Sequence, residues 1–128
     1  MKDFGSHAIS NAESICTAAG ATVPLPRNEM ENDDYSSAFR TLNADKVPLG
    51  INDVTTEGEW RDFNGNEIEY TNWNGGEPNN YRGNEDYVVM YETGKWNDCD
   101  ATCGGGVNTI CESVNGSSTQ FFNSDGLF

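Results

Sequence analysis

The segment over residues 77–98 constrains the fold of this chain most strongly, because it concentrates side chains with oxygen donors. Carboxylates alternate there with carboxamides, and a short apolar run over 87–91 separates the two halves: Glu77, Asn79, Asn80, Glu85 and Asp86 come before it, Asn97 and Asp98 after it. Calcium takes roughly six to eight oxygen ligands in a loose geometry. Without a cation so many carboxylates would repel one another. The sequence therefore predicts a calcium site, and a solvated negative surface is the alternative.

Length and charge narrow the possible functions. A chain of 128 residues with 35% hydrophobic residues forms one domain with a modest core and long ordered loops. The formal net charge of −14 argues against nucleic acid and anionic membrane surfaces as partners, because both would repel the protein. Since no apolar run reaches the length of a transmembrane helix, we expect no membrane insertion.

Four cysteines allow three disulfide pairings. We favour Cys16–Cys111 with Cys99–Cys103, because the first bridge would close a long loop and stabilise the fold by at most about 4–5 kcal/mol. Reduced thiols and a zinc site are the alternatives, and zinc is disfavoured because His7 is the only histidine. Two disulfides would indicate an oxidising, extracellular compartment.

The order of the periodic segments predicts an α+β fold with the helices first. A capping box over 10–13 begins a helix that Gly20 ends, and apolar spacing predicts a second helix from Asn32 or Asp33 to Leu42. Asn64-Gly65 predicts a hairpin, and strands are expected at 47–51, 59–63, 68–70, 87–91, 95–97 and 107–114. The loop over 71–86 is long for a compact domain, and such loops are usually functional, so we expect it to contribute to a site. We assign residues 1–114 to the domain and 115–128 to a tail, or to a linker in a larger surface protein.

Five short motifs, in this order, resemble those of the C-type lectin-like domain over residues 9–112. They are Leu49-Gly50-Ile51, Asn72-Trp73, Glu77-Pro78-Asn79, Trp96-Asn97-Asp98 and Ile110-Cys111-Glu112. Each motif alone is weak evidence, but all five together with cysteines at 16 and 111 are specific. The resemblance implies a C-type lectin fold, in which two helices flank small antiparallel sheets and a long loop binds calcium.

The resemblance also implies which residues form the sites. The positions that hold the family's sugar-binding calcium correspond to Glu77, Asn79, Glu85, Asn97 and Asp98. An auxiliary calcium site is implied for Asp53, Glu57, Asn80, Glu85 and Asp86. Pro78 corresponds to a proline that follows a cis peptide bond. Tyr81 and Arg82, in the long loop, are candidates for further contacts with a ligand.

The sequence departs from the family's pattern at three places. Tyr87 stands where the family has the first cysteine of an inner disulfide, so we expect Cys99 and Cys103 to form a small local ring after Asp98. Pro48 occupies the position of a frequent tryptophan. The N-terminal hairpin and cysteine pair of longer family members are missing. None of these departures affects the expected ligands of the sugar-binding calcium.

The resemblance implies a lectin in which two adjacent sugar hydroxyls bind calcium directly. The same hydroxyls would donate to Glu77 and Glu85 and accept from Asn79 and Asn97. The order Glu-Pro-Asn favours mannose, fucose, N-acetylglucosamine and glucose over galactose. The alternative is a domain that binds a protein or an ice surface and uses calcium only to order the loop. We do not expect catalysis, because the carboxylates are interleaved with amides typical of metal sites.

Overall fold

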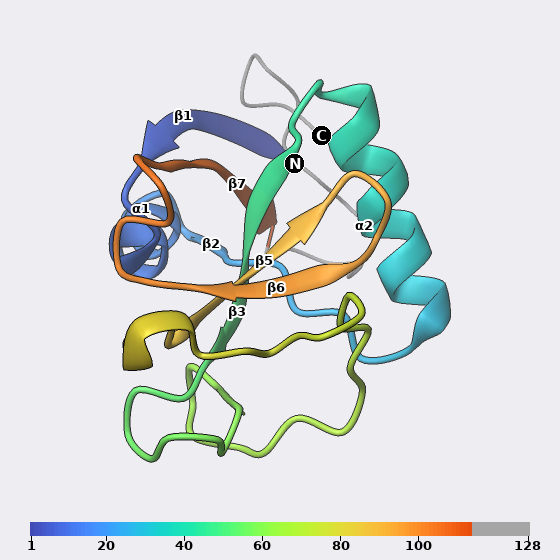
Figure 1. Cartoon of the computed structure of the whole chain (residues 1–128). Coiled ribbons are helices and arrows are strands. Elements are labelled where there is room, and N and C mark those ends of the chain that lie inside the picture. Colours follow the sequence, from blue (N-terminus) through green and yellow to red (C-terminus); the bar gives the residue numbers. More distant parts are fainter. Residues whose placement is uncertain (114–128) are drawn as a thin grey trace.

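The computed structural model of the protein describes residues 1–113, so the predicted tail or linker, 115–128, lies outside the described residues. Within residues 1–113 the chain forms two antiparallel sheets and two α-helices, which confirms the predicted α+β class (Figure 1). The segment that connects the strands of the second sheet, green to yellow in Figure 1, gathers at the end of the molecule opposite the N-terminus.

The first sheet joins the beginning and the end of the domain. Its strand order is β1 (Lys2–His7), β7 (Val107–Ser113) and β2 (Ala21–Thr22). Lys2 pairs with Cys111 and His7 with Val107, with a bulge between Asp3 and Ser6. Strand β1 was not predicted from the sequence, because its polar residues show no alternation and its pairing partner lies about a hundred residues away.

The two helices differ in how they begin. A 3-10 turn, η1 (Ile9–Asn11), leads into α1 (Ala12–Ala18), and neither has a side-chain cap, so the predicted capping box is wrong. The predicted end is confirmed: Gly20 has φ +71° and turns the chain out of the helix. Helix α2 (Glu29–Thr41) begins earlier than predicted, because Asn28 Oδ1 accepts from Glu31 N at 2.8 Å.

The second sheet carries the long loop. Its order is β4 (Arg61–Asp62), β3 (Lys46–Asn52), β5 (Tyr87–Tyr91) and β6 (Trp96–Cys99), close to three of the predicted strands. The predicted hairpin around Asn64-Gly65 is reduced to β4 and a single bridge between Arg61 and Glu67. Residues 68–70 form no strand. Asp62 Oδ1 accepts the backbone N–H groups of Asn64 and Asn66, so the turn satisfies its polar groups locally.

The main core lies between α2 and the strands. The predicted apolar stripe of α2 buries Tyr35 and Phe39, while Ala38 and Leu42 pack at the edge. Gly50, in the Leu-Gly-Ile motif, donates to Pro24 O at 2.8 Å, and a Cβ at this position would lie 3.2 Å from Val23 O. The motif therefore allows the chain over 23–25 to cross β3 closely.

An aromatic cluster fixes the long loop on the core. The ring centroids of Trp73 and Trp96 lie 5.7 Å apart, and those of Trp60 and Trp73 lie 5.2 Å apart. Trp96 is fully buried, and its Nε1 donates to Asn32 Oδ1 at 2.8 Å. Since Trp96 directly precedes Asn97 and Asp98, this packing also sets the position of those two side chains.

Two disulfides link the chain in the pairing that the sequence analysis favoured. Cys16–Cys111 connects α1 to β7, and Cys99–Cys103 closes a ring of five residues after Asp98.

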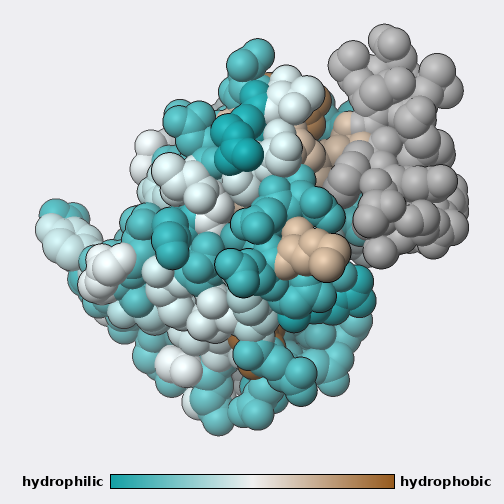
Figure 2. All heavy atoms as spheres, turned by 90° about the vertical axis from the view of Figure 1, so that its right-hand side faces the viewer, coloured by the Kyte–Doolittle hydropathy of each residue, from teal (hydrophilic) through white to brown (hydrophobic). Residues whose placement is uncertain are grey.

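No helix within residues 1–113 combines the length and the apolar character needed to cross a membrane. The face of the molecule shown in Figure 2 is mostly hydrophilic, which agrees with the acidic composition.

Candidate metal centre

Three carboxylates converge where the long loop meets β6. Glu77 and Glu85 come from the loop and Asp98 from the strand, and one oxygen of each lies within 4.8 Å of the others. Asn79 and Asn97 line the same hollow, which has a volume of about 290 Å³. The peptide bond before Pro78 is cis, as expected. The structure therefore brings together all five residues expected around the main ion.

The side chain of Asp98, on β6, holds the long loop through hydrogen bonds. The side chain is 3% exposed, and its two oxygens accept the backbone N–H groups of Asn79 at 3.1 Å and Asn80 at 2.8 Å. Glu85 Oε1 accepts from Tyr81 N at 2.9 Å. Backbone donors of the long loop thus position the carboxylates of Asp98 and Glu85, and their orientation does not depend on a flexible partner.

The amides are oriented in the same way. Asn74 Nδ2 donates to Asn97 Oδ1 at 2.7 Å, and Asn79 Oδ1 accepts from Tyr81 N at 3.2 Å. Each amide oxygen has two lone pairs, so one lone pair stays available in each case. Both side chains can therefore offer an oxygen to a cation and N–H groups to a ligand.

The electrostatics of this cluster favour a cation. Burial, followed by the hydrogen bond and charge of Asp98 and then the charge of Glu85, raises the pKa of Glu77 to about 7. The pKa of Glu85 is raised as well, first by burial, and the charge of Asp98 adds to the effect. A divalent ion would relieve this repulsion, and a set of carboxylate and amide oxygens suits calcium.

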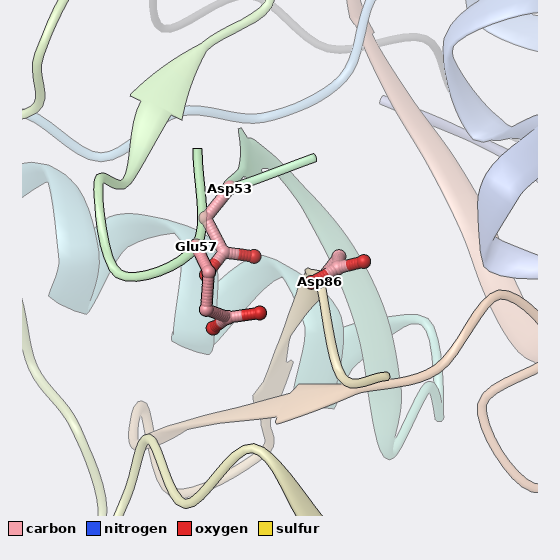
Figure 3. A group of neighbouring side chains, drawn as sticks. All are labelled: Asp53, Glu57 and Asp86. Carbon is pink, nitrogen blue, oxygen red and sulfur yellow. The ribbon is translucent and has the colours of Figure 1, made fainter. Parts of the chain in front are cut away.

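A second cluster joins the end of β3 to the end of the long loop. Oxygens of Asp53, Glu57 and Asp86 lie within 4.8 Å of one another, and Figure 3 shows the three side chains turned toward a common centre. Asp53 is 2% exposed; its Oδ2 accepts from Gly58 N at 2.8 Å, but its buried Oδ1 has no hydrogen-bond partner. A buried carboxylate oxygen without a donor is costly, so this set also fits a cation.

Asn80, expected at the auxiliary site, contacts the main cluster. Its backbone N–H donates to Asp98, and its Oδ1 accepts from Glu85 N at 3.1 Å. Of the residues expected at the auxiliary site, the structure groups Asp53, Glu57 and Asp86, whereas the carboxylate of Glu85 lies in the main cluster. Both hydrogen bonds of Asn80 therefore join it to residues of the main cluster.

Two further candidates lie at the rim. Tyr81 is 59% exposed and lines the hollow, and the Arg82 guanidinium lies 5.2 Å from the centre of the Tyr81 ring. The predicted Cys99–Cys103 ring also lines the hollow, whereas Lys46, Tyr91 and Gly104 were not predicted as site residues. The pairing of β3 with β5, which places Lys46 opposite Tyr91, brings these two residues to the site.

Comparisons with known proteins agree with this architecture. The family model described as "Lectin C-type domain" matches residues 5–113. The carbohydrate-recognition domain of the mouse scavenger receptor C-type lectin superposes with a TM-score of 0.74 at 24% identity, over 85% of this chain and 84% of that one. The C-type lectin CEL-I from Cucumaria echinata gives a TM-score of 0.70 at 24% identity, over 78% and 79% of the two chains.

A third structure is that of the cow carbohydrate-recognition domain of CD23, determined in the presence of a GlcNAc2Man3 oligosaccharide. It has a TM-score of 0.69 and 27% identity, over 81% of this chain and 77% of that one. The family match spans nearly all of the described residues, and the solved structures share their fold. The chain therefore belongs to the C-type lectin domain family.

Proposed function

We propose that this domain binds carbohydrates in a calcium-dependent manner at the hollow between the long loop and β6. The observation that carries the proposal is the convergence of three carboxylates and two amides on one hollow. C-type lectin domains are in general calcium-binding, carbohydrate-binding modules without enzymatic activity, and they are typically extracellular. The two disulfides of this chain are consistent with such a compartment.

The residues that would hold the ion also present hydrogen-bonding groups to a sugar. Bound calcium would supply coordination positions for two adjacent hydroxyl oxygens. Glu77 and Glu85 then accept the hydroxyl protons, and Asn79 and Asn97 donate to the hydroxyl oxygens. Asn97 suits this role because Asn74 already holds its amide oxygen, which leaves its N–H groups available for a ligand.

We further propose that the ligand has adjacent equatorial hydroxyls, as in mannose, glucose and N-acetylglucosamine, or the comparable pair of fucose. The support is the order Glu77-Pro78-Asn79, which places a carboxylate acceptor before the proline and an amide donor after it. The hollow is shallow and bounded by polar groups, so affinity for one sugar is expected to be weak, roughly millimolar. Strong adhesion then requires several copies of the domain.

A glycan array probed with calcium and with chelator tests this proposal. We expect binding to mannose-type or fucose-type glycans that chelator abolishes. Asp98→Asn, which keeps the size of the side chain, should remove this binding. The matched control is Asp34→Asn on α2, which removes one negative charge at an exposed position away from the site. Calcium-dependent stabilisation without any glycan binding would instead support a domain that binds a protein or an ice surface.

A further inference from the structure

We propose that the hollow beside the main metal cluster holds a second sugar residue, so that the ligand of this domain is an oligosaccharide. The second ring lies over Tyr91 and the Cys99–Cys103 ring and meets the ammonium group of Lys46. This inference rests on the proposed function, because it extends the same site.

The dimensions of the hollow support a ligand longer than one sugar. Its lining runs from Asn97 and Asp98 on β6 across β5 to Lys46 on β3. Neighbouring strands lie about 4.8 Å apart, so the backbones of β3 and β6 are separated by about 10 Å. A ring bound at the carboxylates beside β6 therefore leaves Lys46 and Tyr91 for a second, linked ring.

Lys46 is placed to donate to a ligand. Its Nζ donates to Cys103 O at 2.8 Å, and no carboxylate oxygen of residues 1–113 lies within 4.0 Å of it. An ammonium group has three N–H donors, so this contact fixes the side chain and leaves two donors for acceptor oxygens of a ligand. Lys46 is also the only cationic side chain among the residues that line the hollow.

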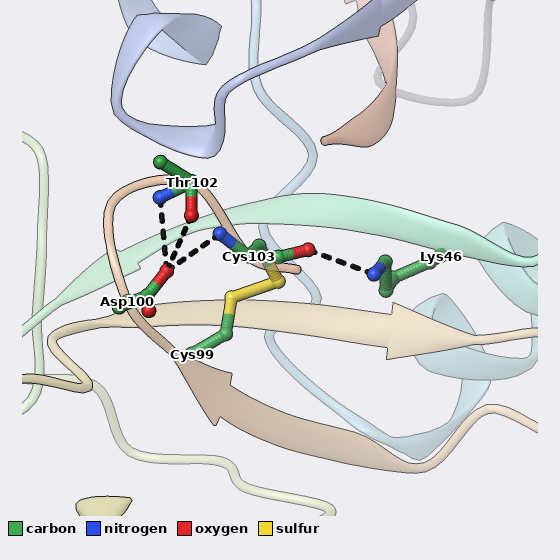
Figure 4. The surroundings of a disulfide bond; sticks show 5 residues. All are labelled: Lys46, Cys99, Asp100, Thr102 and Cys103. Carbon is green, nitrogen blue, oxygen red and sulfur yellow. Dashed lines mark hydrogen bonds between the residues drawn. A yellow bond between two sulfur atoms is a disulfide. The ribbon is translucent and has the colours of Figure 1, made fainter. Parts of the chain in front are cut away.

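The wall beside Lys46 is held in place by covalent and hydrogen bonds. Figure 4 shows the Cys99–Cys103 ring with the Cys103 carbonyl turned toward Lys46. Asp100 Oδ1 accepts from Cys103 N at 2.8 Å and from Thr102 Oγ1 at 2.9 Å. Because these bonds fix the ring before a ligand arrives, binding loses little conformational entropy there.

Tyr91 and Gly104 complete this part of the hollow. Tyr91 lies opposite Lys46 in the β3–β5 pairing and is only partly buried, so its ring offers an apolar surface to the C–H groups of a sugar. A Cβ at Gly104 would lie in van der Waals contact with Lys46 Nζ, at 3.5 Å, so Gly104 lies directly beside the ammonium group. This part of the hollow thus combines an apolar surface with hydrogen-bond donors.

Calorimetric titrations in saturating calcium test the inference. The ligands are methyl mannoside, methyl fucoside and a panel of disaccharides that carry the better of these sugars at the non-reducing end and differ in linkage. We expect at least one disaccharide to bind the wild-type protein about tenfold more tightly than the monosaccharide. Lys46→Met keeps the apolar stem without the ammonium group, and should lose this gain while its affinity for the monosaccharide stays unchanged.

Lys2→Met is the matched control, because it removes a lysine from β1 in the other sheet and should retain the full gain. Thermal unfolding in calcium checks that both variants fold. The inference is overturned if every disaccharide binds within about twofold of the monosaccharide, or if Lys46→Met keeps the gain. If the wild-type protein binds neither the monosaccharides nor the disaccharides, the proposed function fails together with the inference.

Discussion

The two carboxylate clusters have similar chemistry but different surroundings. Asp53, Glu57 and Asp86 gather around a buried oxygen without a donor, where β3 ends and β5 begins. Glu77, Glu85 and Asp98 gather beside a hollow that two amides also line. A cation in the first cluster would mainly join two ends of the fold, whereas a cation in the second would face a ligand. We therefore expect a cation in the first cluster to contribute stability and a cation in the second cluster to contribute recognition.

A backbone hydrogen bond and the chain itself connect the two clusters. Asp53 N donates to Asp86 O at 3.0 Å, and Asp86 directly follows Glu85 of the other cluster. Asn80 then connects Glu85 to Asp98. Ordering the first cluster thus restrains one carboxylate of the second, so some effect of the auxiliary site on sugar binding is expected, and it should be smaller than any direct effect.

The largest expected effect is that of Asp98→Asn. The substitution removes one charge from the main cluster and replaces an acceptor of two backbone N–H groups with an amide that can accept with only one oxygen. We expect calcium-dependent sugar binding to fall by about a hundredfold or more, which corresponds to about 2.7 kcal/mol. Calorimetry with methyl mannoside measures the loss, with Asp34→Asn as the control. Wild-type affinity in Asp98→Asn would show that the recognition site lies elsewhere.

The next effect is a dependence on pH with opposite signs in chelator and in calcium. The pKa of Glu77 is raised to about 7, so without the ion its carboxyl group binds a proton more tightly in the folded than in the unfolded chain. The stability that this proton gives the folded chain is fully present below the unfolded pKa of about 4.5. It is lost as the pH rises through about 7, the pKa of Glu77 in the folded chain. In chelator, the melting temperature should therefore rise as the pH falls from 8 toward 5.

In calcium the sign reverses, because protons compete with the ion for Glu77. With a pKa of about 7 for Glu77, we expect calcium affinity to fall by about fiftyfold between pH 7 and pH 5. Glu77→Gln should flatten both profiles, and Glu69→Gln, at an exposed position outside the cluster, should flatten neither. Equal calcium affinity at both pH values in the wild-type protein would contradict the assignment of Glu77 as a ligand.

A smaller effect on recognition is expected from Asp53→Asn. It should leave sugar affinity at saturating calcium within about threefold of wild type, since the hollow is untouched. It should, however, reduce the stabilisation that calcium confers, which for a ligand at a hundred times its Kd is about 2.7 kcal/mol. Thermal unfolding with and without calcium measures this change. If Asp53→Asn abolished sugar binding and left the calcium effect on melting intact, the roles of the two clusters would be reversed.

The sequence predicted the parts of the fold that depend on local periodicity. The apolar stripe of α2 and the runs that form β3, β5 and β7 carry their pattern within a few residues. The start of α2 was set too late, although Asn28 followed by Glu31 is a capping signal present in the sequence. The polar strand β1 has no such signal, because it exists only through its pairing with β7.

The same distinction applies to the site. The acid and amide residues could be identified because they lie in short motifs. The far side of the hollow could not, since Lys46 and Tyr91 meet only through the register of β3 and β5. The predicted hairpin at Asn64-Gly65 is longer than the observed one. Its turn signal is strong and local, but Ile68 and Tyr70 pack on the core instead of forming the second strand.

The smallest expected effect is that of Tyr81→Ala at the rim of the hollow. Tyr81 is 59% exposed and contributes a backbone N–H, not its side chain, to Glu85, so the substitution leaves the carboxylates in place. We expect calcium affinity to stay unchanged and sugar affinity to fall by about twofold to threefold, because only a partial apolar contact is lost. Titration with calcium and then with the disaccharide separates the two quantities. A tenfold loss of sugar affinity would show that the Tyr81 side chain contributes more to sugar binding than the carboxylate site predicts. An equal loss of calcium affinity would mean that the ring of Tyr81 supports the fold of the loop.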